Sequence, residues 1–403
     1  MIRPTAGHHM KREYYRGRDY RRAMSIDELR ALAERRVPRL AFEYLDGGAE
    51  DEVTLRRNRE VFERIAFLPR TLVDVSKRTQ TVELFGQAMR LPLVIAPTGF
   101  NGMLRRDGDL ALAAAAKEAG IPFSLSTVST NTIESVADRV GGRLWFQLYP
   151  VCDRAVAKRL IERAAAAGYE ALILTTDVPV YGNREWDMRN YLALGRPSLR
   201  AKLDVLAHPR WLFDVMIPHG APMFANLAGI LPSGKNSAID GARYMSTELN
   251  EQLDWDAVRW LRDMWPRRFI VKGLLAPKDA EIAAGHGIDG IVLSNHGGRQ
   301  LDGAISPMEI LPQVCSAAGS RITVMIDSGF RRGSDVVKAL ALGAKAALIG
   351  RAVLYGLAAG GQTGAQHALA ILRGEIDRVL ALLGCRSCNE LSPDCLFRPE
   401  GFR

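Results

Sequence analysis

Short apolar runs occur eight times between residues 91 and 351, and most are separated by a stretch of helical composition. The runs lie at 91–99, 122–127, 144–150, 171–179, 268–274, 290–298, 322–330 and 346–351. Apolar runs of this length are typical of strands covered on both faces in a parallel sheet. The intervening stretches are alanine-rich, as at 110–119, 155–167, 278–284 and 335–342. Strand and helix alternating eight times predict an α/β fold, a (β/α)8 TIM barrel in preference to an open doubly wound sheet.

An N-terminal helical segment precedes the barrel pattern. It begins at Ser25, which stands at capping-box spacing from Glu28, and Pro38 separates it from a second helix. Residues before it are basic and lack the apolar core of a secretory signal. We expect three parts along the chain: a basic disordered tail at 1–24, the barrel domain at 25–393 and a C-terminal tail at 394–403.

A long insertion, 180–254, follows the fourth strand. Its middle part, 205–232, combines apolar bulk with basic residues just upstream, namely Trp211, Phe213, Met216, Phe224 and Leu227 beside Arg196, Arg200, Lys202 and Arg210. This combination favours a segment that lies in a membrane interface, and the alternative is an active-site lid packed on its own barrel. The sequence has no apolar run of spanning length, so a transmembrane helix is not expected.

The charge and the cysteines narrow the classes of partner. A net charge of +9 favours anionic partners, whether acidic substrates, phosphates or anionic lipid. The sequence has no zinc-finger or RNA-recognition signature, so nucleic acid is not expected. The five scattered cysteines predict a reducing compartment without a disulfide framework. Cys385 and Cys388 form a C-x-x-C pair followed by Cys395, but a fourth ligand is not evident, and we predict no metal site.

Residues capable of chemistry follow the apolar runs. They are Pro97-Thr98-Gly99, Ser126, Gln147 with Tyr149, Thr175 with Asp177, Lys272, Ser294 with His296 and Arg299, Asp327 with Arg331, and Gly350-Arg351. Because the carboxyl ends of barrel strands share one rim, these residues should converge there. A histidine exchanges protons near neutral pH, and an arginine forks onto a carboxylate or phosphate. The pattern therefore predicts a base beside an anion clamp.

Several motifs carry a resemblance to one enzyme family. SNHGGRQLD at 294–302 is the most specific of them, and FEYLDGGAED at 42–51, PTGFNG at 97–102 and IDSGFRRGSDVVKALALGA at 326–344 agree with it. From about residue 25 to 393 the chain resembles the FMN-dependent (S)-2-hydroxy acid oxidases and dehydrogenases, and within them the mandelate-oxidising members. The resemblance implies FMN as cofactor and oxidation of an (S)-2-hydroxy acid to the 2-oxo acid. Mandelate is the expected substrate and L-lactate the alternative.

The resemblance also implies how electrons leave the enzyme and where it resides. A membrane quinone or another carrier would accept the electrons, and the alternative is a soluble oxidase that reduces oxygen to hydrogen peroxide. We expect peripheral contact with the cytoplasmic side of the inner membrane, or otherwise a cytoplasmic enzyme. The family further implies a homotetramer.

The resemblance assigns the flavin contacts residue by residue. Those around the isoalloxazine ring would be Pro97, Thr98, Gly99, Ser126, Gln147, Thr175 and Ser294, with Lys272 near the N1/O2 edge. Those around the phosphate would be Asp327, Ser328, Gly329, Arg331, Gly350 and Arg351. A fixed cation at the N1/O2 edge stabilises the anionic reduced ring.

The substrate contacts follow in part from the chemistry. Oxidation of a 2-hydroxy acid removes two electrons and two protons while the carboxylate is held in place. His296 would be the base for the α-proton or the hydroxyl proton, with Asp177 orienting it. Arg184 and Arg299 would hold the carboxylate, with the Tyr44 hydroxyl as a further donor, and the Tyr149 hydroxyl would bind the substrate oxygen that becomes the carbonyl.

Two positions depart from the commoner family pattern. Gly99 stands where many oxidases carry alanine, and in this family glycine accompanies dehydrogenases that react poorly with oxygen. Ser328 replaces a commoner glycine in the phosphate loop. The mandelate-oxidising members resemble this chain there, so FMN binding is still expected.

Overall fold

The computed structural model describes residues 15–187, 189, 199–217, 220–231 and 238–397. Eight parallel strands close into a barrel, in which each strand pairs with the next in the chain and β11 pairs with β4. The strands are β4 (Leu93–Thr98), β5 (Phe123–Ser126), β6 (Leu144–Leu148), β7 (Ala171–Thr175), β8 (Arg268–Leu274), β9 (Gly290–Leu293), β10 (Thr323–Ile326) and β11 (Ala347–Ile349). The predicted (β/α)8 barrel is confirmed.

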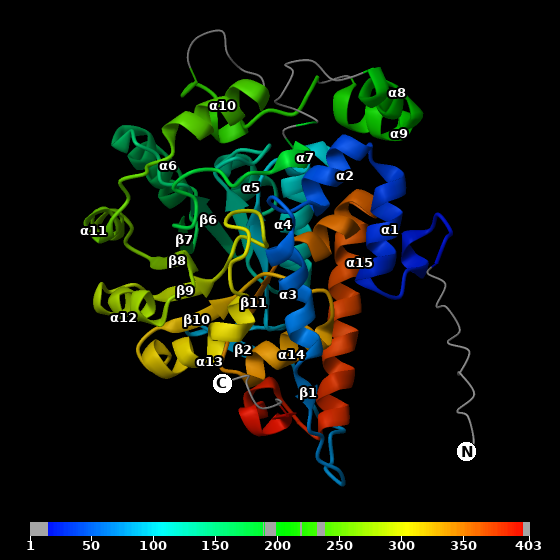
Figure 1. The fold of residues 1–403 in the computed structure, drawn as a ribbon, viewed down its shortest axis with the longest axis vertical. Helices are drawn as coiled ribbons and strands as arrows, with labels where there is room; N and C mark the ends of the chain where they lie inside the picture. The colour runs from blue at the N-terminus through cyan, green and yellow to red at the C-terminus, as the bar shows by residue number, and fades with distance from the viewer. Residues whose placement is uncertain (1–14, 188, 190–198, 218–219, 232–237, 398–403) are drawn as a thin grey trace, which may run out of the picture.

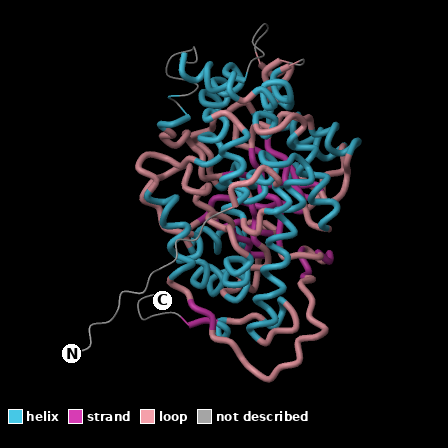
Figure 2. Tube along the Cα trace, turned by 90° about the vertical axis from the view of Figure 1, so that its right-hand side faces the viewer, coloured by secondary structure: helices cyan, strands magenta, loops and turns pink. Residues whose placement is uncertain are grey.

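Helices surround the barrel on its outside (Figure 2). They are α4 (Gly108–Ala119), α5 (Ile133–Arg139), α6 (Arg154–Ala166), α11 (Trp255–Met264), α12 (Pro277–Gly285), α13 (Pro307–Ala318), α14 (Gly333–Ala341) and α15 (Arg351–Leu383). Nearly every strand residue is buried because each strand faces the barrel interior on one side and a helix on the other. The long α15 is kinked at Gly361, whose φ is 64°.

The N-terminal segment folds against α15. It contains η1 (Tyr20–Arg22), α1 (Ile26–Arg36), α2 (Arg39–Asp46) and α3 (Val53–Glu63) (Figure 1). The Ser25 hydroxyl accepts a hydrogen bond from the backbone N–H of Glu28, as the capping spacing predicts. The Tyr20 hydroxyl lies 2.6 Å from Oγ1 of Thr363. Within the expected tail, the structure describes residues 15–24, which include η1, while 1–14 lie outside the described residues.

A small hairpin covers the opposite end of the barrel from the rim. Strands β2 (Val82–Leu84) and β3 (Gln87–Met89) pair through a turn at Phe85, whose ring lies 6.1 Å from that of Trp145 in β6. A second short sheet pairs β1 (Ala66–Phe67) with β12 (Leu396–Phe397), so the expected C-terminal tail contains a paired strand. Residues 398–403 lie outside the described part of the chain.

The insertion lies above the rim, where the sequence places it (Figure 1). Its elements are α7 (Glu185–Asp187), α8 (Leu199–Ala207), α9 (Pro209–Trp211), η4 (Leu212–Met216), η5 (Ala225–Leu227) and α10 (Ala238–Glu248). Trp211 Nε1 donates a 2.7 Å hydrogen bond to the carbonyl oxygen of Met103, which anchors α9 to the barrel. Within the described residues, every helix is too short or too polar to cross a bilayer.

Candidate active site

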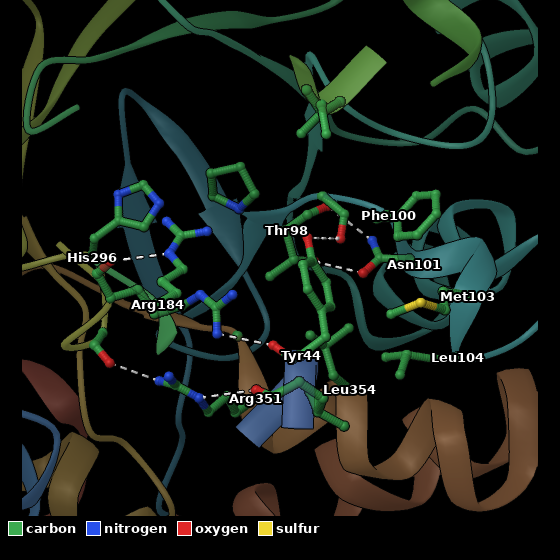
Figure 3. A pocket seen from close by; sticks show the side chains of 18 of the residues that line it. Tyr44, Thr98, Phe100, Asn101, Met103, Leu104, Arg184, His296, Arg351 and Leu354 are labelled. Atoms are coloured by element: carbon green, nitrogen blue, oxygen red, sulfur yellow. Dashed lines mark hydrogen bonds between the residues drawn. The ribbon is translucent and has the colours of Figure 1, made fainter. Parts of the chain in front are cut away.

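A cavity of about 1220 Å³ opens at the carboxyl ends of the strands. The N-terminal segment, the strand ends and the insertion all contribute to its wall (Figure 3). The predicted site residues in the wall are Tyr44, Pro97, Thr98, Gly99, Tyr149, Arg184, Lys272, His296, Arg299, Asp327, Ser328, Gly329, Arg331, Gly350 and Arg351. The others form hydrogen bonds directly behind the wall: Ser126, Gln147, Thr175, Asp177 and Ser294.

His296 and Asp177 form a base–carboxylate pair. Nδ1 of His296 lies 2.9 Å from Oδ1 of Asp177, and Nε2 lies 3.5 Å from the Tyr149 hydroxyl. Burial lowers the pKa of His296 below its usual value, despite the opposing charge of Asp177. Burial alone would raise the pKa of Asp177, but the charges of His296 and Lys272 bring it below its usual value. A neutral imidazole held by an ionised carboxylate can accept a proton at Nε2.

Gln300 fixes the loop that carries Asp177 and Arg184, and the sequence analysis did not identify it. The Gln300 Nε2 atom donates hydrogen bonds to the carbonyl oxygens of Asp177 and Val180, at 3.0 and 2.9 Å. Its Oε1 atom accepts from the N–H of Gly182 and from Nη2 of Arg184, at 3.1 and 3.0 Å. One amide thus satisfies four backbone and side-chain groups of this loop. Its place directly after Arg299 in the family motif was the available signal.

Gly273 gives Asp177 room, and it too was missed. Its φ of 112° lies in the region that side chains rarely adopt, and a Cβ there would lie 2.7 Å from Cβ of Asp177. Only glycine therefore allows β8 to approach the Asp177 carboxylate so closely. This contact joins residues that are distant in the sequence, so no local sequence pattern predicts it.

Lys272 supplies a buried cation to the cavity. Its Nζ atom donates a 2.7 Å hydrogen bond to Ser294 Oγ and lies 3.0 Å from Oδ2 of Asp327. Burial alone would lower the pKa of Lys272, but the charges of Asp327 and Asp177 raise it above its usual value. The Asp327 carboxylate therefore pairs with Lys272, a contact that the predicted role in the phosphate loop did not include.

A buried polar layer supports the cavity floor. Ser126 Oγ donates to Oε1 of Gln147, and Nε2 of Gln147 donates to Oγ1 of Thr175, both at 2.9 Å. All three side chains are 1% exposed. The two bonds fix the orientation of the Gln147 amide, so the layer presents a defined set of polar groups beneath the predicted flavin position.

The loop after β4 is held by Asp109, a residue that the sequence analysis did not identify. Asp109 is fully buried, and it accepts hydrogen bonds from Asn101 Nδ2 at 2.7 Å and from the N–H and hydroxyl of Thr130, both at 2.9 Å. Asn101 in turn donates to the carbonyl oxygen of Thr98 at 3.0 Å. Burial raises the pKa of Asp109 against the effect of these bonds. The network positions the Thr98 backbone at the cavity wall.

Gly99 is sterically constrained. A methyl group there would lie 2.5 Å from Cγ2 of Val128. The Gly99 carbonyl oxygen also accepts a 3.3 Å hydrogen bond from the Tyr44 hydroxyl. Because Gly99 has no side chain, the loop after β4 can lie against Val128. The Gly99 carbonyl oxygen also holds Tyr44 of α2.

The inner end of the cavity is cationic. Arg351 is half-buried and donates to three backbone carbonyl oxygens, at 2.7–3.1 Å. Burial and the neighbouring charges of Arg299 and Arg331 lower its pKa to about 10. A phosphate dianion between these guanidinium groups would relieve the accumulated positive charge.

The backbone beside these arginines allows close approach to a phosphate. Around Gly350 the nearest atom to an added Cβ is 3.6 Å away, and Gly329 has a φ of 89°. Ser328 has a φ of 75°, which explains why glycine is common at this position. Its hydroxyl donates to Asp327 Oδ1 at 2.8 Å and accepts from the N–H of Gly297 at 3.1 Å. The cavity size, the buried lysine and this cradle fit FMN.

The three predicted carboxylate-binding residues lie together. Arg299 donates to the carbonyl oxygens of Tyr44 and Gly47 at 2.9 and 2.8 Å, and its guanidinium carbon lies 5.1 Å from the Tyr44 ring centre. Arg184 Nε donates to the carbonyl oxygen of Arg299 at 3.0 Å. Figure 3 shows Arg184 and His296 on one side of the pocket, and Phe100, Met103 and Leu104 on the other.

The cysteines lie outside the cavity. All five are free thiols, and Sγ of Cys385 is 4.0 Å from Sγ of Cys395. In the part of the chain that the structure describes, no cluster of side chains is arranged to hold a metal ion.

A closed (β/α)8 barrel whose rim joins a histidine base, a buried lysine and a phosphate cradle defines a flavin-dependent barrel oxidoreductase. The FMN-dependent dehydrogenase family matches residues 33–398, and this chain belongs to that family, with FMN as its cofactor. It is 49% identical to (S)-mandelate dehydrogenase of Pseudomonas putida, over 92% of this chain and 93% of that protein. It is 43% identical to L-lactate oxidase of Nostoc sp., over 93% of this chain and 98% of that protein.

A solved structure agrees with this assignment. The crystal structure of the monotopic membrane protein (S)-mandelate dehydrogenase matches with a TM-score of 0.89 and 48% identity, over 94% of this chain and 100% of that chain. The family predicted from the SNHGGRQLD motif is confirmed.

Proposed function

We propose that this enzyme oxidises an (S)-2-hydroxy acid with an aromatic side chain, such as (S)-mandelate, to the 2-oxo acid at a membrane surface. The observation that carries the substrate class is a cavity in which a cationic clamp and a base face an aromatic wall. The names of its relatives support a 2-hydroxy acid as substrate, since they include a mandelate dehydrogenase and a lactate oxidase, and the mandelate dehydrogenase supports an aromatic side chain.

The aromatic wall joins three parts of the chain. Phe100, which follows β4, makes edge-to-face contacts with Tyr44 from α2 and Phe224 from the insertion, with ring centres 6.1 and 5.2 Å apart. Met103 and Leu104 extend the same apolar surface. A phenyl ring would find apolar and edge-to-face partners there, whereas the methyl group of lactate would leave most of this surface uncovered.

The residues of the chain divide the reaction among them. Arg184 and Arg299 bind the carboxylate, and the Tyr149 hydroxyl binds the oxygen that becomes the carbonyl. His296 Nε2 takes one proton, and the Asp177 carboxylate stabilises the resulting imidazolium. FMN, when bound, accepts the two electrons, and Lys272 provides a positive charge for its reduced form.

Anaerobic mixing of the yellow protein with (S)-mandelate and, separately, (S)-lactate tests the substrate. We expect mandelate to bleach the flavin absorbance much faster than lactate and air to restore the colour slowly. Bleaching by lactate alone would move the substrate to L-lactate, and fast recovery in air would make the enzyme an oxidase. If neither acid bleaches a fully loaded flavin, the proposal is wrong.

The same proposal places the insertion against a bilayer. Leu199, Leu203 and Leu206 of α8 are 75%, 59% and 63% exposed, and their spacing puts them on one helix face. Phe213, on η4, is 66% exposed. Basic side chains lie on α8 and on α9 between α8 and η4: Arg200, Lys202, which also lines the cavity, and Arg210. Apolar side chains beside basic ones suit anionic lipid, and this surface includes Leu199 and Leu203, which precede the predicted 205–232.

Cell fractionation tests the membrane contact. We expect the parent in the membrane fraction, released by detergent, and a Leu199→Asn/Leu203→Asn variant in the soluble fraction with its flavin retained. A parent found in the soluble fraction without detergent would contradict the membrane contact.

The free thiols support the cytoplasmic side, and thiol labelling of intact cells against lysed cells tests it. Light scattering in detergent tests the tetramer that the family resemblance implies.

A further inference from the structure

Tyr181 lines the active-site cavity in addition to the residues that divide the reaction among them. It lies in the loop after β7, shortly beyond Asp177. Within the part of the chain that the structure describes, its hydroxyl group has no hydrogen-bond partner. Burial raises the pKa of Tyr181 above its usual value, so the hydroxyl stays protonated at neutral pH. The cavity wall therefore contains a neutral hydroxyl group that can donate to a ligand.

The backbone around Tyr181 is held on both sides. Nε2 of Gln300 donates to the carbonyl oxygen of Val180 at 2.9 Å, and the N–H of Gly182 donates to Oε1 of Gln300 at 3.1 Å. A Cβ atom at Gly182 would collide with the carbonyl oxygen of Arg299, so only glycine lets the two loops lie this close together. The tyrosine is thus attached to the loop that carries Arg299, and its position is set before a ligand binds.

The ring of Tyr181 lies beside Arg184. The guanidinium carbon of Arg184 is 5.5 Å from the centre of this ring, which is a cation–π contact. Tyr149 and Tyr44 raise the pKa of Tyr181 further, and the charge of Arg184 opposes them. All four side chains line the same cavity. The Tyr181 side chain therefore belongs to the polar group that surrounds the predicted substrate position.

The other two tyrosine hydroxyls of this group have protein partners. The Tyr44 hydroxyl donates to the carbonyl oxygen of Gly99 at 3.3 Å, and the Tyr149 hydroxyl lies 3.5 Å from Nε2 of His296. A phenolic hydroxyl has one proton to donate. Of these three tyrosines, Tyr181 can therefore donate to a ligand without breaking a hydrogen bond that the structure shows.

The ligand group that suits this hydroxyl is the carboxylate between Arg184 and Arg299. The two oxygens of a carboxylate accept about four hydrogen bonds. Both guanidinium groups already donate in part to the protein: Arg184 to the Arg299 carbonyl and to Gln300, and Arg299 to two backbone carbonyls. A carboxylate held there therefore has sites for a further donor. A neutral hydroxyl supplies one without adding to the positive charge of the clamp.

We propose that Tyr181 is a further substrate-binding residue, whose hydroxyl group donates a hydrogen bond to the substrate carboxylate beside Arg184. The inference rests on the proposed function and adds a residue to its substrate site. The carboxylate keeps its charge while the neighbouring carbon is oxidised, so this bond is equally strong in the bound substrate and in the transition state. Such a contact lowers KM and leaves kcat unchanged.

Titration of the oxidised, flavin-loaded enzyme with phenylacetate tests this contact without turnover, through the change in flavin absorbance. Tyr181→Phe keeps the ring and removes the hydroxyl. It should raise the Kd for phenylacetate by at least about tenfold and leave the Kd for the neutral analogue 2-phenylethanol unchanged. Tyr20→Phe is the matched control, because the Tyr20 hydroxyl lies outside the cavity wall, 2.6 Å from Thr363 Oγ1. An unchanged Kd for phenylacetate in Tyr181→Phe, or equal weakening of both ligands, would overturn the proposal.

Steady-state kinetics separate a substrate contact from mere support of Arg184. Tyr181→Phe should raise the KM for (S)-mandelate by about tenfold and leave kcat within about twofold of the parent. Tyr181→Leu also removes the ring beside Arg184 and should lower kcat/KM further. If Tyr181→Phe matches the parent while Tyr181→Leu is impaired, only the ring matters and the proposal is wrong. If no 2-hydroxy acid bleaches the parent flavin, the proposed function fails instead, and the phenylacetate titration still tests the Tyr181 hydroxyl.

Discussion

His296 Nδ1 and Asp177 Oδ1 lie 2.9 Å apart in a largely buried pair at the cavity wall. The histidine is held neutral by burial, and the carboxylate is the group that opposes this effect. The pair therefore sets both the orientation of the base and the pH range in which it works.

Asp177→Asn should lower turnover by about 10²- to 10⁴-fold and move the acid limb of the pH profile. In the parent, kcat/KM should rise as the pH increases through the His296 pKa, with a midpoint below 6.5, the usual histidine value. The substitution removes the charge that raises this pKa, so the midpoint should shift to still lower pH. The measurement is kcat/KM against pH for loaded enzyme. A midpoint that moves upward would show that another group controls this limb.

Gln300→Leu should weaken substrate binding and catalysis together, because it releases the loop that carries Asp177 and Arg184. We expect KM for the acid to rise and kcat to fall, each by about tenfold, since the amide makes four hydrogen bonds of roughly 1 kcal/mol each. Steady-state kinetics at equal flavin content provide the measurement. Gln313→Leu, on the exposed side of α13, is the control. If Gln300→Leu has the kinetics of the parent, the loop that carries Asp177 and Arg184 keeps its conformation without the Gln300 amide.

A comparison of Gly273→Ala with Gly287→Ala separates the effect of backbone strain from the effect of steric crowding. Both glycines have positive φ, but an added Cβ meets Asp177 at Gly273 and meets nothing within 4 Å at Gly287. Gly287→Ala should lower the free energy of unfolding by about 1–2 kcal/mol with normal turnover. Gly273→Ala should be less stable and nearly inactive. Chemical denaturation and turnover measure both effects, and an active Gly273→Ala enzyme would contradict the contact with Asp177.

The strands and most rim residues could be predicted because each leaves a local trace. A buried parallel strand is a short apolar run, and the polar residue after it reaches the rim through topology alone. The ends of the strands were harder to predict. Strand β9 stops at Leu293 because the chain turns at Ser294 into the loop of His296. Ser328 has a left-handed backbone conformation, which serine rarely adopts, so the residue type itself did not indicate this conformation.

Asp109 and the β2–β3 hairpin were missed because each depends on contacts that form only in the folded chain. Asp109 reaches the flavin loop through Asn101, and its own surroundings in α4 are alanine-rich and featureless. The hairpin of β2 and β3 consists of strands too short for a periodic pattern. Such features depend on the three-dimensional packing of the whole chain, so a single sequence carries no local pattern for them.

Arg351→Met should release the cofactor. Its guanidinium group lies at the phosphate end of the cavity, where it adds its charge to those of Arg299 and Arg331 and donates to three backbone carbonyl oxygens. We expect the Kd for FMN to rise by at least about tenfold, measured from the fluorescence of free flavin during dilution. Arg267→Met is the matched control, because Arg267 also donates its hydrogen bonds to backbone carbonyls, those of Ala165 and Tyr169, but lies outside the cavity wall. If both variants retain FMN equally well, Arg351 serves the fold and the phosphate is held elsewhere.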